Sequence, residues 1–134
     1  YYPGDCNVLT EWAPGKTYPV QCDFSVMISP EQFKRFVVPE MDAIGQYLDY
    51  FYWHLDGPDE IKHLDTILSK DYVKVVQWVP VAGKPDALYW IDLLKKIQDA
   101  GKSIMCYCDN YDNAIAISEI LKPEGLWIRY AKSA

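Results

Sequence analysis

Hydrophobic residues alternate between strand-like and helix-like spacing along most of the chain. The strand-like segments are rich in β-branched and aromatic residues and occupy residues 18–24, 51–55, 73–79, 103–108 and 126–130. The segments between them carry hydrophobic residues three or four positions apart, which is typical of amphipathic helices. The pattern therefore predicts five strands alternating with four helices.

Polar and special residues mark where these helices begin and end. Ser29 is a suitable N-cap, since it is followed by a proline at the first helical position and by Gln32 three residues later. Pro39 lies inside the same pattern, so we expect a kink or a division of that helix. A second helix is predicted to start at Gly57-Pro58-Asp59-Glu60, directly after a strand, and Gly101 fits the end of a third.

Strands and helices that alternate with short connections indicate an α/β fold with a mainly parallel sheet. We expect one domain over residues 1–134, beginning with an irregular segment, 1–17, that is rich in proline and glycine. Two architectures are open. A doubly wound sheet is complete within about 130 residues, whereas a (β/α)8 barrel needs about 250. Length alone favours the open sheet.

Composition narrows the class of partner. The chain has 134 residues, of which 50% are hydrophobic, enough for a packed core. Its 19 acidic and 13 basic residues give a net charge of −6 without a basic cluster, which argues against nucleic acid or an anionic membrane as partner. A small neutral or cationic ligand remains open. Four cysteines without disulfide-like spacing predict reduced thiols and a cytoplasmic protein.

His54 and Asp56 are the strongest candidates for chemistry. Residues two apart in a strand point to the same side, so Tyr52, His54 and Asp56 share one face near the carboxyl end of their strand. A histidine binds metals or transfers protons near neutral pH, and a neighbouring carboxylate fixes its tautomer or adds an oxygen ligand. The alternative reading is structural, with Asp56 capping the next helix and His54 a hydrogen-bonded lining residue.

Other polar or aromatic residues follow predicted strands. Asp23 closes the first strand and, with His54 and Asp56, is expected to carry catalysis. Four further residues are expected to contact the substrate, namely Gln77, Trp78, Tyr107 and Asp109. Each also has a structural reading, since Trp78 fits a core and Asp109 fits a helix cap. His63 lies within a predicted helix, and we expect it at the surface or half-buried.

One stretch resembles a known family. Asp23 followed by Ser29-Pro30-x-x-Phe33-x-x-Phe36-x-x-Pro39 resembles the uroporphyrinogen decarboxylase superfamily, in which an aspartate-bearing strand precedes such a helix. The segments FYWHLDGP, VVQWVPVAG and KKIQDAGK also resemble decarboxylase-like proteins of that superfamily. The resemblance covers nearly the whole chain but only the second half of the family's fold. It therefore implies the C-terminal half of a TIM-type (β/α)8 barrel and overrules the length argument.

The resemblance also implies a metal chemistry. Corrinoid-linked methyltransferases of the superfamily have a His-x-Cys-Gly motif at this strand end, which binds zinc together with a later cysteine. Here the motif reads His54-Leu55-Asp56-Gly57, and the last strand has no cysteine. His54 and Asp56 are the metal ligands that the motif suggests, and two ligands are too few for zinc. Cys106 and Cys108 are candidates for the missing thiolate.

Two activities follow from the resemblance: methyl transfer with a corrinoid carried by a partner protein, or decarboxylation of a porphyrinogen. Arg35 and Arg129 are the only arginines, which disfavours a substrate with eight carboxylates. The methyltransferase type is therefore preferred. Both chemistries need the other half of the barrel, so we expect this chain to be inactive alone and to form homo-oligomers through its exposed half-barrel surface. The alternatives are a non-catalytic self-associating half-barrel and an open-sheet binding module.

Overall fold

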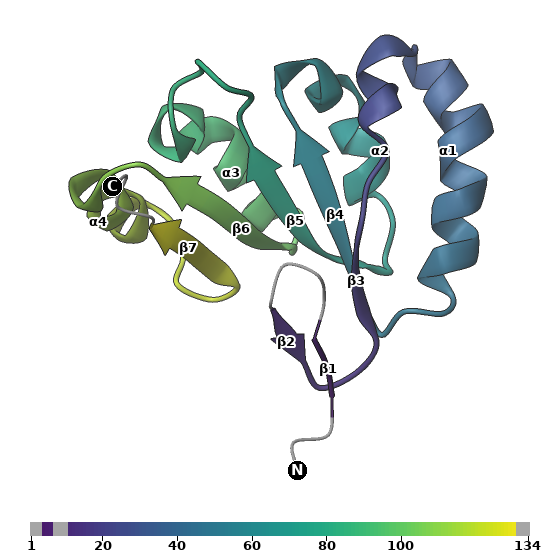
Figure 1. The fold of residues 1–134 in the computed structure, drawn as a ribbon, viewed down its shortest axis with the longest axis horizontal. Coiled ribbons are helices and arrows are strands. Elements are labelled where there is room, and N and C mark those ends of the chain that lie inside the picture. Colours follow the sequence, from purple (N-terminus) through teal and green to yellow (C-terminus); the bar gives the residue numbers. More distant parts are fainter. Residues whose placement is uncertain (1–3, 7–10, 131–134) are drawn as a thin grey trace.

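The computed structural model describes residues 4–6 and 11–130, and their main feature is a parallel sheet (Figure 1). Each strand of this sheet pairs with the next along the chain, in the order β3 (Thr17–Val20), β4 (Tyr50–Asp56), β5 (Val73–Val79), β6 (Ser103–Cys108) and β7 (Leu126–Tyr130). The predicted α/β class and parallel sheet are confirmed. The last three strands have the predicted bounds, and β4 is one residue longer at each end.

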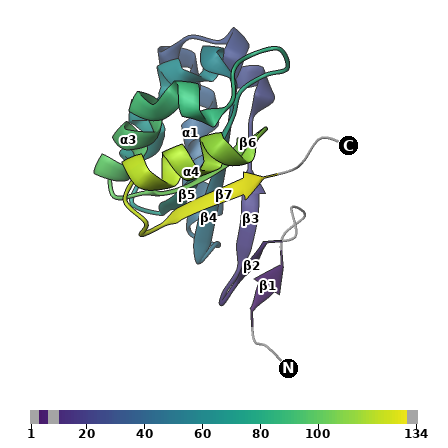
Figure 2. The ribbon, with the colours of Figure 1, turned by 90° about the vertical axis from the view of Figure 1, so that its left-hand side faces the viewer.

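The helices cover one face of this sheet (Figure 2). They are α1 (Pro30–Gly45), α2 (Leu64–Leu68), α3 (Ile91–Asp99) and α4 (Tyr111–Ile120), and three of the connections also contain the 3-10 turns η1 (Asp23–Met27), η2 (Pro58–His63) and η3 (Ala87–Trp90). When successive parallel strands are neighbours and all crossovers have one hand, every helix falls on the same side. A doubly wound sheet instead reverses its strand order, and no reversal occurs between β3 and β7.

Helix α1 begins as the sequence indicates. The Ser29 hydroxyl accepts a hydrogen bond from the Gln32 amide at 3.2 Å, and the Gln32 side chain accepts one from the Ser29 amide at 2.9 Å. Of the kink or division expected at Pro39, the division does not occur, since a single helix runs through it. Proline removes one backbone donor, and the helix is held on both sides of it by buried contacts of Phe33 and Met41.

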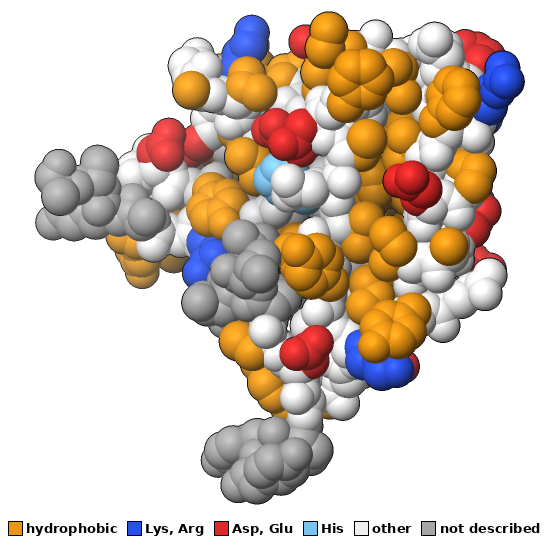
Figure 3. All heavy atoms as spheres, turned by 45° about the vertical axis from the view of Figure 1, so that its right-hand side comes forward, with side chains coloured by type: hydrophobic (Ala, Val, Ile, Leu, Met, Phe, Trp, Pro, Cys, Tyr) orange, Lys and Arg blue, Asp and Glu red, His pale blue; other side chains and the backbone are white. Residues whose placement is uncertain are grey.

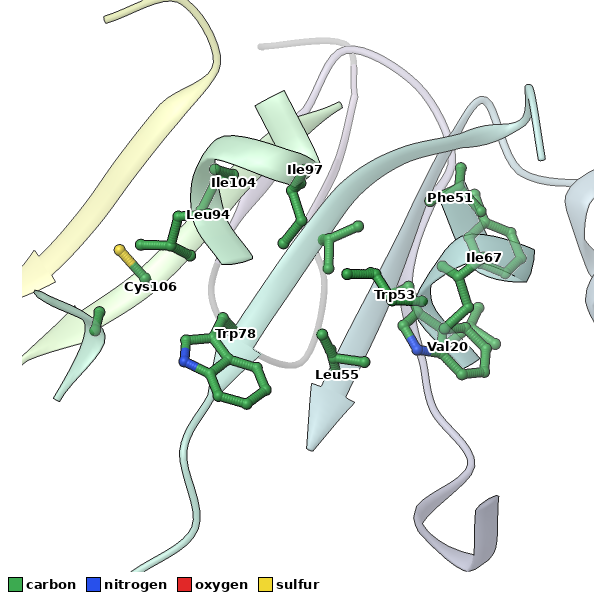
Figure 4. Packing of buried hydrophobic residues seen from close by; sticks show 14 of the residues in the cluster. Val20, Phe51, Trp53, Leu55, Ile67, Trp78, Leu94, Ile97, Ile104 and Cys106 are labelled. Carbon is green, nitrogen blue, oxygen red and sulfur yellow. The ribbon is translucent and has the colours of Figure 1, made fainter. Parts of the chain in front are cut away.

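The core lies between the sheet and these helices (Figure 4). On β4, the alternate residues Phe51, Trp53 and Leu55 are fully buried on this side. Aromatic packing joins the layers, with Phe33 of α1 meeting Trp53 edge to face at a centroid distance of 6.0 Å. The same cluster takes in residues from β5, β6 and α3, including Val76, Trp78, Leu94, Ile97, Ile104 and Cys106.

The opposite face of the sheet carries polar side chains and meets the N-terminal segment. Within the predicted irregular segment 1–17, β1 (Asp5–Cys6) pairs antiparallel with β2 (Trp12–Ala13), so this part has more order than expected; residues 1–3 and 7–10 lie outside the described part. Glu11 is buried and pairs with Arg129 of β7 at 3.4 Å. This ion pair ties the start of the chain to the last strand of the sheet.

Among the described residues, no helix is both long and apolar enough to cross a membrane.

Candidate metal-binding site

Three predicted catalytic residues meet at the carboxyl end of the sheet. Asp23, His54 and Asp56 each offer one ligand atom, and these atoms all lie within 4.8 Å of one another. Asp23 is exposed, and the other two residues are half-buried. Strand alternation brings His54 and Asp56 to the same face of β4, as expected. Figure 3 shows histidine surface (pale blue) directly beside acidic surface (red).

Asp23 reaches this site from a turn and not from a strand end. This strand of the sheet stops at Val20, four residues before the predicted end at 24, and Asp23 is the first residue of η1. The backbone turns here because the Ser25 amide donates a hydrogen bond to the Cys22 carbonyl at 2.8 Å. The 3-10 turn thereby directs the carboxylate of Asp23 back toward β4.

A buried glutamate connects the two segments that carry the three residues. Glu60 of η2 is fully buried, and its carboxylate accepts hydrogen bonds from the Ser25 hydroxyl at 2.6 Å and from the Asp56 amide at 2.5 Å. Burial raises the pKa of Glu60 to about 7, although both hydrogen bonds act in the opposite direction. Glu60 therefore fixes η1 against the end of β4.

Two further side chains of η2 hold the same turn. The Lys62 ammonium donates to the Val26 carbonyl at 2.6 Å, and His63 Nε2 donates to the Ser25 carbonyl at 2.9 Å. The expectation that His63 lies at or near the surface is wrong. It is fully buried and stacks on Phe33 at a centroid distance of 4.2 Å, and burial lowers its pKa. A neutral His63 thus supports the turn that carries Asp23.

His54 is oriented from the neighbouring strand. Its Nδ1 lies 2.5 Å from Oε1 of Gln77 on β5. An amide oxygen only accepts hydrogen bonds, so Nδ1 carries a proton, and in the neutral ring the lone pair that can bind a metal is on Nε2. Gln77 Nε2 donates to the Tyr107 hydroxyl at 3.2 Å, and Arg129 Nη1 lies 3.4 Å from the same oxygen. A row of polar side chains therefore crosses four strands and ends at His54.

The three ligand atoms fit a divalent metal ion. Metal–ligand distances of about 2.0–2.2 Å place neighbouring ligand atoms roughly 3–4 Å apart, so a cluster within 4.8 Å needs only small side-chain movements. One imidazole and two carboxylates suit zinc, manganese or iron better than a soft thiolate-preferring ion. The open side of the cluster leaves room for water or substrate, because Asp23 is exposed.

Gln77 and Tyr107 lie on the face that carries His54, but two other predicted substrate-binding residues do not join the site. Trp78 follows Gln77 in β5 and therefore points to the opposite face, where it is fully buried and meets Trp90 at 5.0 Å. It is a core residue. Asp109 is exposed after β6, beside a separate cavity of about 280 Å³ that Asp86 and Tyr107 also line.

The two cysteines of β6 do not supply the missing thiolate. Cys106 and Cys108 belong to the core cluster on the helix-covered face, away from His54. Burial raises the pKa of Cys106 to about 12 and that of Cys108 to about 11. Neither thiol is therefore positioned or ionised as a metal ligand, and the expectation that they could substitute is wrong.

Two residues that hold the site were not found from the sequence. Glu60 was assigned to a helix start, where acidic residues are common, and Ser25 gave no signal. Their contact joins positions 35 apart, which only the fold reveals.

Comparisons with protein-family models, with curated proteins and with solved structures return no match for this chain.

Proposed function

We propose that this chain is the C-terminal half of a (β/α)8 barrel of the uroporphyrinogen decarboxylase-like type, and that it binds a divalent metal ion through Asp23, His54 and Asp56. Two features support the half-barrel: neighbouring strands follow chain order, and the helices share one face. The site lies at the carboxyl ends of the strands, where barrel enzymes carry their chemistry.

The observation that carries the metal proposal is the cluster of three ligand atoms within 4.8 Å. Asp23 comes from a segment that lies 31 positions before His54 along the chain, so local sequence does not account for the cluster. The buried Glu60 also holds the two segments together, which favours a site that is organised before the ion arrives.

Each residue has a defined part in this proposal. His54 binds through Nε2, since Gln77 engages Nδ1. The carboxylates of Asp23 and Asp56 offset the charge of the ion. A bound divalent ion supplies Lewis-acid polarisation of a coordinated substrate atom. Tyr107 keeps Gln77 in place by accepting from its amide, which restrains the ring of His54.

The methyltransferase type is preferred over the decarboxylase type. The Arg129 guanidinium pairs with Glu11, and the Arg35 guanidinium lies over the Phe36 ring at 5.1 Å. The chain has only these two arginines, so a substrate with many carboxylates would have few guanidinium partners. The proposed protein ligands contain no sulfur, unlike the zinc sites of the corrinoid-linked enzymes. We therefore expect the substrate to approach the metal through an oxygen or nitrogen atom.

The proposed partners are a small-molecule substrate or a corrinoid protein at the carboxyl end of the sheet, and a second copy of the chain at its edges. The described residues leave β3 and β7 without a partner on their outer sides. Exposed strand edges favour association with another polypeptide. Sedimentation velocity at tens of micromolar tests self-association, and a strictly monomeric profile contradicts it.

Titration calorimetry with Zn²⁺ and Mn²⁺ tests the metal proposal, with His54→Ala and Asp56→Asn as site variants. Asp71→Asn is the matched control, since Asp71 is exposed just before β5 at the amino end of the sheet. We expect one ion per chain for the wild type and for Asp71→Asn, and at least a tenfold weaker affinity for either site variant. Equal affinities for all four proteins would contradict the proposal.

A further inference from the structure

A cleft of about 950 Å³ runs along the edge strand β3 and is lined at one end by His54, whereas Asp23 and Asp56 line a second cavity of about 260 Å³. Both faces of the edge strand contribute, because consecutive residues from Lys16 to Gln21 line it. Helix α1 and the turn after it form one wall. The remaining lining residues come from the N-terminal segment and from the polar face of the sheet: Asp5, His54, Gln77, Val79 and Tyr107. Figure 3 shows hydrophobic surface (orange) beside the histidine.

Strand register gives the cleft a direction and a length. Thr17 pairs with Tyr50 and Val20 with Trp53, so His54 lies level with Gln21 at the carboxyl end of β3. Lys16 lies at the opposite end. The five steps from Lys16 to Gln21, at about 3.3 Å each, correspond to a cleft about 16 Å long. One end is therefore at the proposed metal ligand His54, and the other is at the amino end of the sheet.

The chemistry changes along this length. The part toward the amino end of the sheet is apolar, with Ile44, Leu48 and the exposed ring of Tyr47 contributed by the end of α1 and the turn that follows it. His54, Gln77 and Tyr107 gather at the metal end. The Lys16 ammonium marks the far end and lies 4.3 Å from the centre of the Tyr47 ring. An apolar body with a polar head matches this arrangement.

We propose that the cleft binds a slender, mainly apolar small molecule, up to about 16 Å long, whose polar head lies at His54. The head-group part of this inference rests on the proposed metal function. A cleft of this volume with a few convergent polar groups is typical of small-molecule sites. An added polypeptide strand fits less well, because Pro19 in the middle of β3 has no N–H to donate.

The test uses a series of probes with one head group and increasing tails: acetohydroxamate, hexanohydroxamate and octanohydroxamate, titrated into the Zn²⁺-loaded protein. Hydroxamates coordinate metal ions through two oxygens, so only the tail varies. We expect the affinity to rise with chain length, by up to about fourfold per added methylene group. All three tails are shorter than the cleft, so the rise should continue to octanohydroxamate.

Ile44→Asp tests the apolar wall, and Ile115→Asp is its matched control. Both isoleucines are helical and similarly exposed, at 37% and 40%, but only Ile44 lines the cleft. We expect Ile44→Asp to lose at least tenfold in affinity for octanohydroxamate and to leave acetohydroxamate binding unchanged. Ile115→Asp should bind both like the wild type. An affinity independent of tail length, or equal losses in the two variants, overturns the proposal.

A metal-free arm separates this inference from the proposed function. 1-Hexanol and 1-octanol have the tail without the chelating head, and their binding to the metal-free protein reports on the cleft alone. Tighter binding of octanol that Ile44→Asp abolishes supports the cleft even if no metal binds. A dimer that Ile44→Asp dissociates, together with no alcohol binding, identifies a second copy as the occupant and overturns the proposal.

Discussion

The two faces of β4 differ in burial and in chemistry, although they come from the same seven residues. Phe51, Trp53 and Leu55 are fully buried beneath the helices. On the other face, His54 and Asp56 are half-buried and belong to the candidate metal site. A strand that alternates in this way assigns stability to one face and chemistry to the other. Substitutions on the helix-covered face should therefore lower the free energy of unfolding, and substitutions on the polar face should weaken metal binding.

The largest expected effect is on the helix-covered face. Trp53→Ala removes a fully buried indole and should lower the free energy of unfolding by about 3–5 kcal/mol. His54→Ala, one position away, removes a half-buried ring and one hydrogen bond and should cost about 1 kcal/mol. Urea denaturation followed by circular dichroism measures both. Similar losses for the two variants would contradict the division of roles between the faces.

Glu60, which bonds to the backbone of Asp56, should make the free energy of unfolding depend on pH. Its pKa is raised from 4.5 to about 7 in the folded protein, so the folded state holds a proton that the unfolded state releases as the pH rises through this window. Stability is therefore lost between about pH 4.5 and 7, by up to about 3 kcal/mol relative to Glu60→Gln.

Denaturation of the wild type and of Glu60→Gln at pH 4, 6 and 8 measures this difference. Glutamine keeps an acceptor for the Asp56 amide and can donate to the Ser25 hydroxyl, so the variant should fold. Parallel stability curves across the three pH values would show that Glu60 does not titrate in this range.

A smaller effect is expected at Gln77, where two substitutions test whether its hydrogen bond positions the His54 ring. Gln77→Leu removes the acceptor that orients His54 and should weaken Zn²⁺ affinity by about 10–100-fold. Gln77→Glu keeps an acceptor at the same place and should retain most of the affinity. Calorimetry gives the affinities, and unfolding curves check that both variants fold. If the two substitutions weaken binding equally, the hydrogen bond to His54 does not position the ring.

The smallest effect is expected at Asp109. This carboxylate is exposed after β6 and is not part of the cluster of Asp23, His54 and Asp56. Asp109→Asn should change Zn²⁺ affinity by less than about twofold and stability by less than about 0.5 kcal/mol. The same titrations provide the measurement. A loss comparable with that of Asp56→Asn would place Asp109 in the site after all.

Much of the fold could be predicted because its signals are local. The β-branched run at 73–79 and the capping residues around Ser29 each specify their own element, and the order of elements predicted the parallel sheet. The pairing of His54 with Asp56 followed from alternation alone. The same alternation separates Trp78 from Gln77, so that residue could have been assigned to the core at the outset.

The remaining errors concern contacts that local patterns do not encode. The bend that carries Asp23 away from a strand end depends on a hydrogen bond within η1. The burial of His63 depends on Phe33, which is 30 positions earlier and belongs to another helix. Glu60 likewise joins two distant segments. The three candidate ligands could therefore be named from the sequence, while the residues that hold them together could not.

The ion pair between Glu11 and Arg129 has a consequence for the order of folding. It joins positions 118 apart, whereas each parallel strand pairs with its neighbour across a single crossover. Closing so long a loop costs more chain entropy than closing one crossover, so adjacent strand–helix units should assemble first and the N-terminal segment should dock last. The N-terminal segment would then bind the polar side of the sheet in the last step of folding, after β7 has paired with β6.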